Sequence, residues 1–288
     1  MAVIQTNRTL SRGDSLKSLG AVSANTVAEV ASKSDIIFSC VSNDAVLQDV
    51  AKDIIASGSI EGKVYVDCST VHPDTSVDVG KQILQAGGQF VAAPVFGAAA
   101  MAEAGKLIFV IAGPEEAKSK MAPYLKDVMG RSVMDMGSDV SKSSLLKIAG
   151  NICVISFMEV ISEAHVFAEK TGLGCATLEN MLGNMFGPVV ESYSKRITTG
   201  AYAPAPDGKA GFDVRLAVKD AKHALNCAKT AGTRLEVSEV ALRHMEEAMA
   251  SSELDGRPLD SSSMYGAIRK EAGMDFFSDV CKQMDSAK

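Results

Sequence analysis

Residues 62–88, GKVYVDCSTVHPDTSVDVGKQILQAGG, decide the fold that the sequence predicts. The stretch begins with a continuous apolar run that ends in polar residues, which is typical of a buried strand. A helical pattern follows at once, with Pro73 in its first turn and Gly87 and Gly88 at its end. Buried strands that alternate with helices predict a parallel sheet that is covered on both faces.

The same alternation extends over the N-terminal half of the chain. Helical patterns lie in residues 20–35, 45–57 and 114–130, and apolar strand-like runs lie in residues 3–6, 36–44, 89–97, 106–113 and 131–137. This order predicts a doubly wound α/β domain over residues 1–138.

From residue 139 onward the pattern is helical. Residues 141–172 form one long, strongly apolar helical pattern, and the later patterns also have helical spacing, without strand signals. We therefore expect an all-α domain over residues 139–288, which begins with one long helix.

The composition argues against several classes of protein. The 288 residues carry a net charge of −6, which argues against a nucleic-acid surface. Apolar stretches are too short to cross a bilayer, or are interrupted by polar residues as in 151–167, so no membrane contact is expected. The 6 cysteines are scattered, which favours a reducing cytosol. The basic N-terminus weakly resembles an organellar presequence, so a mitochondrial location is the alternative to a cytoplasmic one.

Two stretches at predicted strand ends could bind a ligand. Ser69 and Thr70 end the strand in 62–70, where hydroxyl groups can hydrogen-bond a ligand, although a helix cap before Pro73 is the alternative. Residues 93–107, APVFGAAAMAEAGKL, form a small-residue loop that would let a ligand approach the backbone, or a plain connecting turn.

Two lysines on helical patterns are further candidates. Lys147 and Asn151 are four residues apart and share one helix face. A lysine that is partly buried in an apolar helix can act as a proton donor near neutrality, and a snorkelling lysine is the alternative. Lys219 and Asp220 form a second pair, for which a solvated helix face is the alternative.

The order and spacing of five stretches resemble the β-hydroxyacid dehydrogenase family, which includes 3-hydroxyisobutyrate dehydrogenases and is related to 6-phosphogluconate dehydrogenases. The matches are NRT (7–9), DCSTVHP (67–73), APVFGAAAMAEAGKL (93–107), GSDVSKSSLLKIAGN (137–151) and FDVRLAVKDAKHALNCAKTAG (212–232). The resemblance implies a Rossmann-type domain and a helical domain, a small carbonyl or hydroxyacid substrate, and a homodimer or homotetramer built through the helical domain.

The resemblance also implies roles for individual residues. Lys147 would be the catalytic proton donor, and Asn151 would hold the substrate beside it. Ser69 and the loop Phe96, Gly97 and Ala98 would contact the acid end of the substrate. The cofactor would be lined by Asn7, Arg8, Thr9, Val41, Ser42, Val46, Thr70 and Lys219. No metal ligand is implied.

Three departures from the family pattern affect the expected function. The family has a first strand and a G-x-G-x-x-G loop before the NRT position; neither occurs here, which implies a sheet truncated at its N-terminus with a gap beside the strand in 3–6. Arg8 stands where NAD enzymes place an acid, so it favours NADP, and hence NADPH, over NAD. Phe96 replaces the serine of the family's Ser-Gly-Gly loop, so a bulkier or less polar carbonyl compound becomes a better candidate substrate.

These observations lead to one main function and two alternatives. The main expectation is an NADP-dependent oxidoreductase that acts on a small β-hydroxyacid or related compound. The absent G-x-G-x-x-G loop favours a non-catalytic binding or oligomerisation protein instead. Imine reduction is the third reading, and the retained Lys147 counts against it because sister imine reductases commonly lack that lysine.

Overall fold

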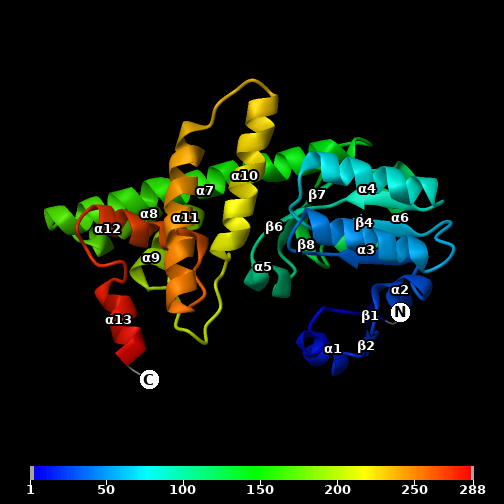
Figure 1. Ribbon diagram of the computed structural model, residues 1–288, viewed down its shortest axis with the longest axis horizontal. Helices are drawn as coiled ribbons and strands as arrows, with labels where there is room; N and C mark the ends of the chain where they lie inside the picture. The colour runs from blue at the N-terminus through cyan, green and yellow to red at the C-terminus, as the bar shows by residue number, and fades with distance from the viewer. Residues whose placement is uncertain (1–2, 287–288) are drawn as a thin grey trace. The chain divides into compact units, whose positions relative to one another are not determined.

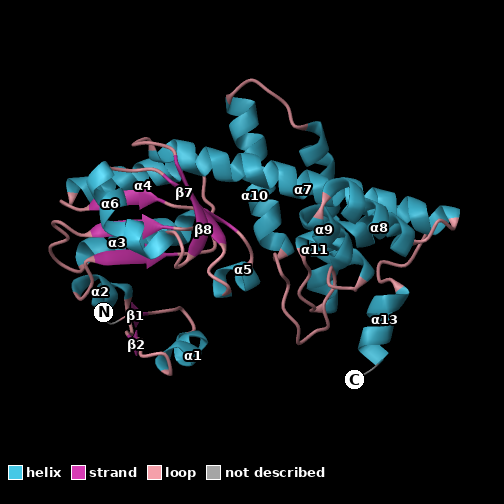
Figure 2. Ribbon diagram, turned by 180° about the vertical axis from the view of Figure 1, so that it is seen from behind, coloured by secondary structure: helices cyan, strands magenta, loops and turns pink. Residues whose placement is uncertain are grey.

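The computed structural model describes residues 3–286, apart from the side chains of residues 252–255, and divides into two compact units, 1–147 and 148–288 (Figures 1 and 2). Each unit is described by itself below. The elements of the first unit are β1 (Ile4–Gln5), η1 (Leu10–Gly13), α1 (Asp14–Lys17), β2 (Val22–Ser23), α2 (Val27–Ser32), β3 (Ile36–Ser39), α3 (Asp44–Ala56), β4 (Val64–Asp67), α4 (Pro73–Gln85), β5 (Gln89–Ala92), β6 (Val95–Phe96), α5 (Ala99–Glu103), β7 (Leu107–Ile111), α6 (Glu115–Leu125) and β8 (Gly130–Asp135). Helix α7 (Val140–Thr171) begins in this unit and continues into the second.

The centre of the first unit is the parallel sheet β3-β4-β5. All four residues of β4 are buried, because the strand lies between two neighbours and helices cover both of its faces. The predicted buried strand in residues 62–70 is therefore confirmed, and its register places Ser39 beside Asp67 and Asp67 beside Ala92.

The two faces of this sheet contribute to two separate hydrophobic clusters. Tyr65 and Phe90 pack with side chains of α3 and α4, such as Leu47 and Ile83. Val66 and its neighbours on the opposite face pack with α6 and β7. Figure 2 shows these helices beside the strands. This arrangement confirms the predicted doubly wound α/β class.

The edges of the unit differ in detail from the predicted single parallel sheet. Residues 20–35 are not one helix, because Val22 and Ser23 form the strand β2, which pairs in parallel with β1 in a separate two-stranded sheet. The expected strand in 89–97 is divided between β5 and β6, and β6 pairs antiparallel with β7 in a third sheet. Pro94 lies between β5 and β6, and proline cannot donate a ladder hydrogen bond.

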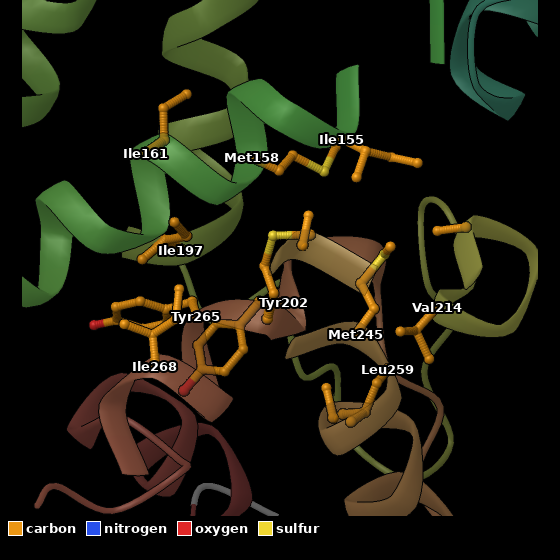
Figure 3. Close-up of a cluster of buried hydrophobic side chains, with 14 of the residues drawn as sticks. Ile155, Met158, Ile161, Ile197, Tyr202, Val214, Met245, Leu259, Tyr265 and Ile268 are labelled. Atoms are coloured by element: carbon orange, nitrogen blue, oxygen red, sulfur yellow. The ribbon is translucent and has the colours of Figure 1, made fainter. Parts of the chain in front are cut away.

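The second unit is helical, as predicted. It contains the rest of α7, then α8 (Cys175–Phe186), α9 (Pro188–Thr198), α10 (Val214–Thr230), α11 (Glu236–Asp255), η2 (Ser261–Ser263), α12 (Met264–Glu271) and α13 (Asp279–Ser286). The long helix predicted for 141–172 is confirmed by α7. In the core of the second unit, Met158 and Ile161 of α7 pack with Met245, Tyr265 and their neighbours (Figure 3).

Helix α7 is also the one helix within residues 3–286 that is long and apolar enough to cross a membrane. Core helices of soluble proteins meet the same criterion. Ile155, Met158 and Ile161 of α7 are buried in the core of the second unit, which is how a helix of this composition packs in a helical domain.

Candidate functional site

A buried carboxylate joins the carboxyl ends of β3 and β4. The Asp67 side chain, which is 2% exposed, accepts hydrogen bonds at Oδ1 from the hydroxyls of Ser39 and Ser69, each at 2.7 Å. The Ser69 Oγ in turn accepts a hydrogen bond from the Val41 backbone N–H at 2.8 Å. Asp67 and Ser69 therefore fix the loop that follows β3 against the end of β4.

The network extends from Asp67 to the buried phenol of Tyr65. Burial raises the pKa of Tyr65, and the nearby charge of Asp67 adds to the shift, so the phenol stays protonated. Tyr65 Oη lies 2.9 Å from Ser39 Oγ. Because Ser39 donates its own proton to Asp67, Tyr65 is the donor in that contact. The hydroxyl protons of this network thus point toward Asp67.

This geometry places Ser69 differently from the sequence prediction. Its one proton goes to Asp67, and one lone pair is taken by Val41. Neither Ser69 nor Thr70 caps α4, because His72 is the N-cap and accepts a hydrogen bond at Nδ1 from the Asp74 N–H at 3.3 Å. The proposed contact of Ser69 with the substrate remains a prediction.

The predicted cofactor residues after β3 lie at the start of α3. Val41 and Ser42 belong to the loop, and Val46 donates its backbone N–H to the N-cap residue Asn43 at 3.0 Å. Asp44 Oδ1 accepts from the His72 N–H and from Thr75 Oγ1, both at 2.8 Å. Side-chain hydrogen bonds therefore tie the loops after β3 and β4 to each other.

The NRT segment follows β1, which pairs with β2 and lies outside the central sheet. The Asn7 side chain accepts a hydrogen bond from the Thr9 N–H at 3.0 Å, which is a local turn that Asn favours. Arg8 is exposed at the tip of this turn.

Strand β6 ends at Phe96, whose ring lies against Lys147. The Lys147 Nζ lies 4.5 Å from the centroid of the Phe96 ring. Lys147 is held there by the start of α7, where the Ser143 hydroxyl donates to backbone carbonyls of β5 and β7 and Ser144 contacts Ser76 at 2.8 Å. Both side chains are half-buried, while Gly97 and Ala98 are exposed.

The second unit joins Asn151 and Lys219 through a carboxylate. Asn151 Nδ2 donates to Asp220 Oδ2 at 2.7 Å, and Lys219 Nζ lies 3.0 Å from Asp220 Oδ1. Asn151 and Asp220 are 4% and 3% exposed, so the hydrogen bond between them is largely shielded from water. Asn151 lies one helical turn after Lys147 on α7.

The sequence pattern assigns no role of their own to Asp67 and Asp220, the two carboxylates that organise these clusters. Asp67 has a recognisable signal, since it is the charged residue that ends the apolar run of β4. Asp220 is adjacent to Lys219 in the sequence, but its hydrogen bond with Asn151 spans 69 residues and has no sequence signal. Among the side chains that the structure describes, which exclude those of residues 252–255, no group of three or more from His, Cys, Asp or Glu could hold a metal ion.

Comparisons with known proteins match both units. Residues 1–137 match the NAD binding domain of 6-phosphogluconate dehydrogenase, and residues 142–268 match the NAD-binding domain of NADP-dependent 3-hydroxyisobutyrate dehydrogenase. Glyoxylate/succinic semialdehyde reductase 1 from Arabidopsis thaliana is 33% identical over 74% of this chain and 74% of its own length. The NADH-dependent oxidoreductase ucdB from Aspergillus ustus is 29% identical over 88% of this chain and 84% of its own length.

A solved structure shares the fold. Psf3 in complex with NADP+ and 2-OPP has a TM-score of 0.80 at 20% identity, covering 93% of this chain and 92% of its own. At that identity the likeness concerns the fold alone.

The Asp67 network makes a prediction about stability. Asp67→Ala would leave the half-buried hydroxyl of Ser39 and the buried hydroxyl of Ser69 without their acceptor, so we expect the free energy of unfolding to fall by about 2–4 kcal/mol. Asp67→Asn should cost less, because the amide oxygen can accept the same protons. Urea unfolding of both variants measures this, with exposed Asp78→Ala as the matched control. Equal stability of Asp67→Ala and Asp78→Ala would contradict the assigned network.

Proposed function

The chain belongs to the β-hydroxyacid dehydrogenase family, and we propose that it is an NADP-dependent oxidoreductase that interconverts a small β-hydroxyacid, or a related alcohol, and its carbonyl compound. The observation that carries this proposal is the setting of Lys147. It is half-buried, lies against Phe96, and precedes Asn151 by one turn of the same helix.

The chemistry assigns one task to each residue. When bound, the nicotinamide would supply or accept the hydride. Reduction leaves negative charge on the substrate oxygen, and the Lys147 ammonium would deliver a proton to it. Asn151 would orient the carbonyl, and its amide is itself oriented by the hydrogen bond to buried Asp220. Lys219, paired with the same carboxylate, would supply positive charge toward the cofactor.

The cofactor preference rests on Arg8. A guanidinium can form two charge-assisted hydrogen bonds to a 2′-phosphate, and Arg8 is exposed directly after β1. The ends of β3 and β4 would support the rest of the dinucleotide through the loop that Asp67 and Ser69 fix. The relatives do not decide between cofactors, since one is named as NADH-dependent and another holds NADP+.

We expect NADPH to bind more tightly than NADH. Arg8→Asp should weaken NADPH binding by about tenfold or more and leave NADH nearly unchanged, because only NADPH carries the phosphate that Arg8 would contact. Fluorescence titration with both nucleotides measures this, with exposed Arg131→Asp as the control for net charge. An unchanged NADPH/NADH ratio would exclude Arg8 as the reader of the phosphate. Failure of both nucleotides to bind would favour the non-catalytic alternative.

The role of Lys147 leads to a second prediction. Lys147→Ala should lower carbonyl reduction by about a hundred- to ten-thousand-fold, while NADPH affinity stays nearly constant. Lys147→Arg should not restore turnover, because a guanidinium does not release its proton near neutral pH. Exposed Lys142→Ala, at the first turn of the same helix, is the control. Near-normal turnover of Lys147→Ala on carbonyls would overturn the mechanism, and turnover confined to imines would favour the imine alternative.

We also propose that the chain forms a homodimer or homotetramer through its helical unit. Phe157, Val160 and Phe167 lie along one side of α7 and are 47%, 56% and 63% exposed. A row of large apolar side chains on a surface helix is a common contact between copies of a chain.

The molar mass measured by light scattering should be that of a dimer or tetramer. Phe157→Asp together with Phe167→Asp should reduce it to a monomer, whereas exposed Leu84→Asp on α4 should not. A monomeric wild-type chain would refute the proposal.

A further inference from the structure

The segment beside Lys147, which runs from the end of β6 into α5, has no polar side chain over seven residues. Residues 96–102 read FGAAAMA, so only backbone groups there could donate a hydrogen bond to a ligand. Gly97 to Ala102 are exposed, and Phe96 is half-buried. The N–H groups of Met101 and Ala102 already bond to the Ala98 carbonyl. A carboxylate would therefore find no side-chain donor on this segment, and only the backbone N–H groups that precede Met101 could bind it.

The backbone fixes the direction of the Phe96 side chain. Phe96 pairs with Ile108 in the antiparallel ladder of β6 and β7. Gly97 follows with φ of +129°, and a Cβ at that position would lie 2.7 Å from Leu107 Cδ2. Only glycine fits this turn, so the loop leaves β6 in one direction and the Phe96 ring is held at the side of Lys147.

The electrostatics of the ring favour a cation and disfavour an anion. The face of an aromatic ring is negative, so it attracts an ammonium group such as Lys147 Nζ at 4.5 Å from the centroid. The ring offers no hydrogen-bond donor to a carboxylate that approaches Lys147 from the Phe96 side. Phe96 thus holds the proton donor and lines its surroundings with apolar surface.

We propose that Phe96 determines substrate specificity, by selecting carbonyl compounds whose group on the Phe96 side of the reacting carbonyl is apolar rather than a carboxylate. This inference rests on the proposed oxidoreductase function and narrows its substrate class. Phe96 also acts as a positioning residue for Lys147, because its ring contacts the ammonium directly.

A matched pair of substrates tests the specificity. Butanal and succinic semialdehyde differ by a methyl group in place of a carboxylate, and the wild-type chain should have the higher kcat/KM for butanal. Phe96→Ser removes the apolar ring and adds a donor, so it should shift the kcat/KM ratio toward succinic semialdehyde by about tenfold or more. Phe96→Tyr, which keeps the ring face, should retain the wild-type ratio. Phe186→Leu, a substitution of an exposed phenylalanine on α8, is the control.

A spectroscopic measurement tests the contact without turnover. Reductive ¹³C-methylation labels lysine amines, and the resonance missing from Lys147→Arg identifies Lys147. A methylammonium over a ring face should resonate upfield of exposed lysines in the wild type and in Phe96→Tyr, and should return to the exposed position in Phe96→Leu.

The two measurements distinguish failure of the specificity role, of the positioning role and of the proposed oxidoreductase function. Turnover of both aldehydes with a ratio that is unchanged in Phe96→Ser would overturn the specificity role. A Lys147 resonance that does not respond to Phe96→Leu would overturn the positioning role. If no aldehyde is turned over but the resonance responds to Phe96, the proposed oxidoreductase function fails while the contact stands.

Discussion

The Asp67 carboxylate is the interaction on which the polar edge of the sheet depends. An ionised carboxylate in a nearly dry position is costly unless hydrogen bonds compensate it. Ser39 and Ser69 supply two such bonds, and the backbone of Val41 completes the chain of donors. Because these donors come from β3 and from the loops that follow β3 and β4, satisfying one carboxylate also fixes the surface at which parallel sheets bind ligands.

Helix α7 has a comparable part in placing the candidate catalytic groups. Its first turns are bonded to the sheet through Ser143, and its later turns lie in the core of the second unit. Lys147 and Asn151 therefore keep a spacing of one helical turn whatever the loops around them do. A proton donor and its orienting amide on one helix are held more rigidly than the same pair on two loops would be.

The sequence predicted the parts of this fold that depend on local pattern. The buried run of β4 and the apolar periodicity of α7 each extend over enough residues to identify the element, and both elements were found where expected. Strand β2 has only two residues and was hidden in a helical pattern, because its pairing with β1 is set by contacts distant in sequence. For the same reason Asp220 could be noticed beside Lys219 but not connected to Asn151.

The site residues also differ in whether local sequence or distant contacts reveal them. Lys147 and Arg8 could be chosen from motifs, since their proposed chemistry belongs to the side chain itself. The contact between Phe96 and Lys147 spans 51 positions in the chain and follows only from the ladder of β6 with β7 and the anchoring of α7. Family membership fixes the fold that holds Lys147, and the residue whose ring lies against Lys147 is free to differ. A phenyl ring in place of a hydroxyl at that position removes a hydrogen-bond partner that a polar substrate group would need. A polar substrate group left without a partner lowers kcat/KM far more than a change in the size of an apolar group does. Under the proposed mechanism, substrate choice would therefore depend on a side chain whose identity the fold does not constrain.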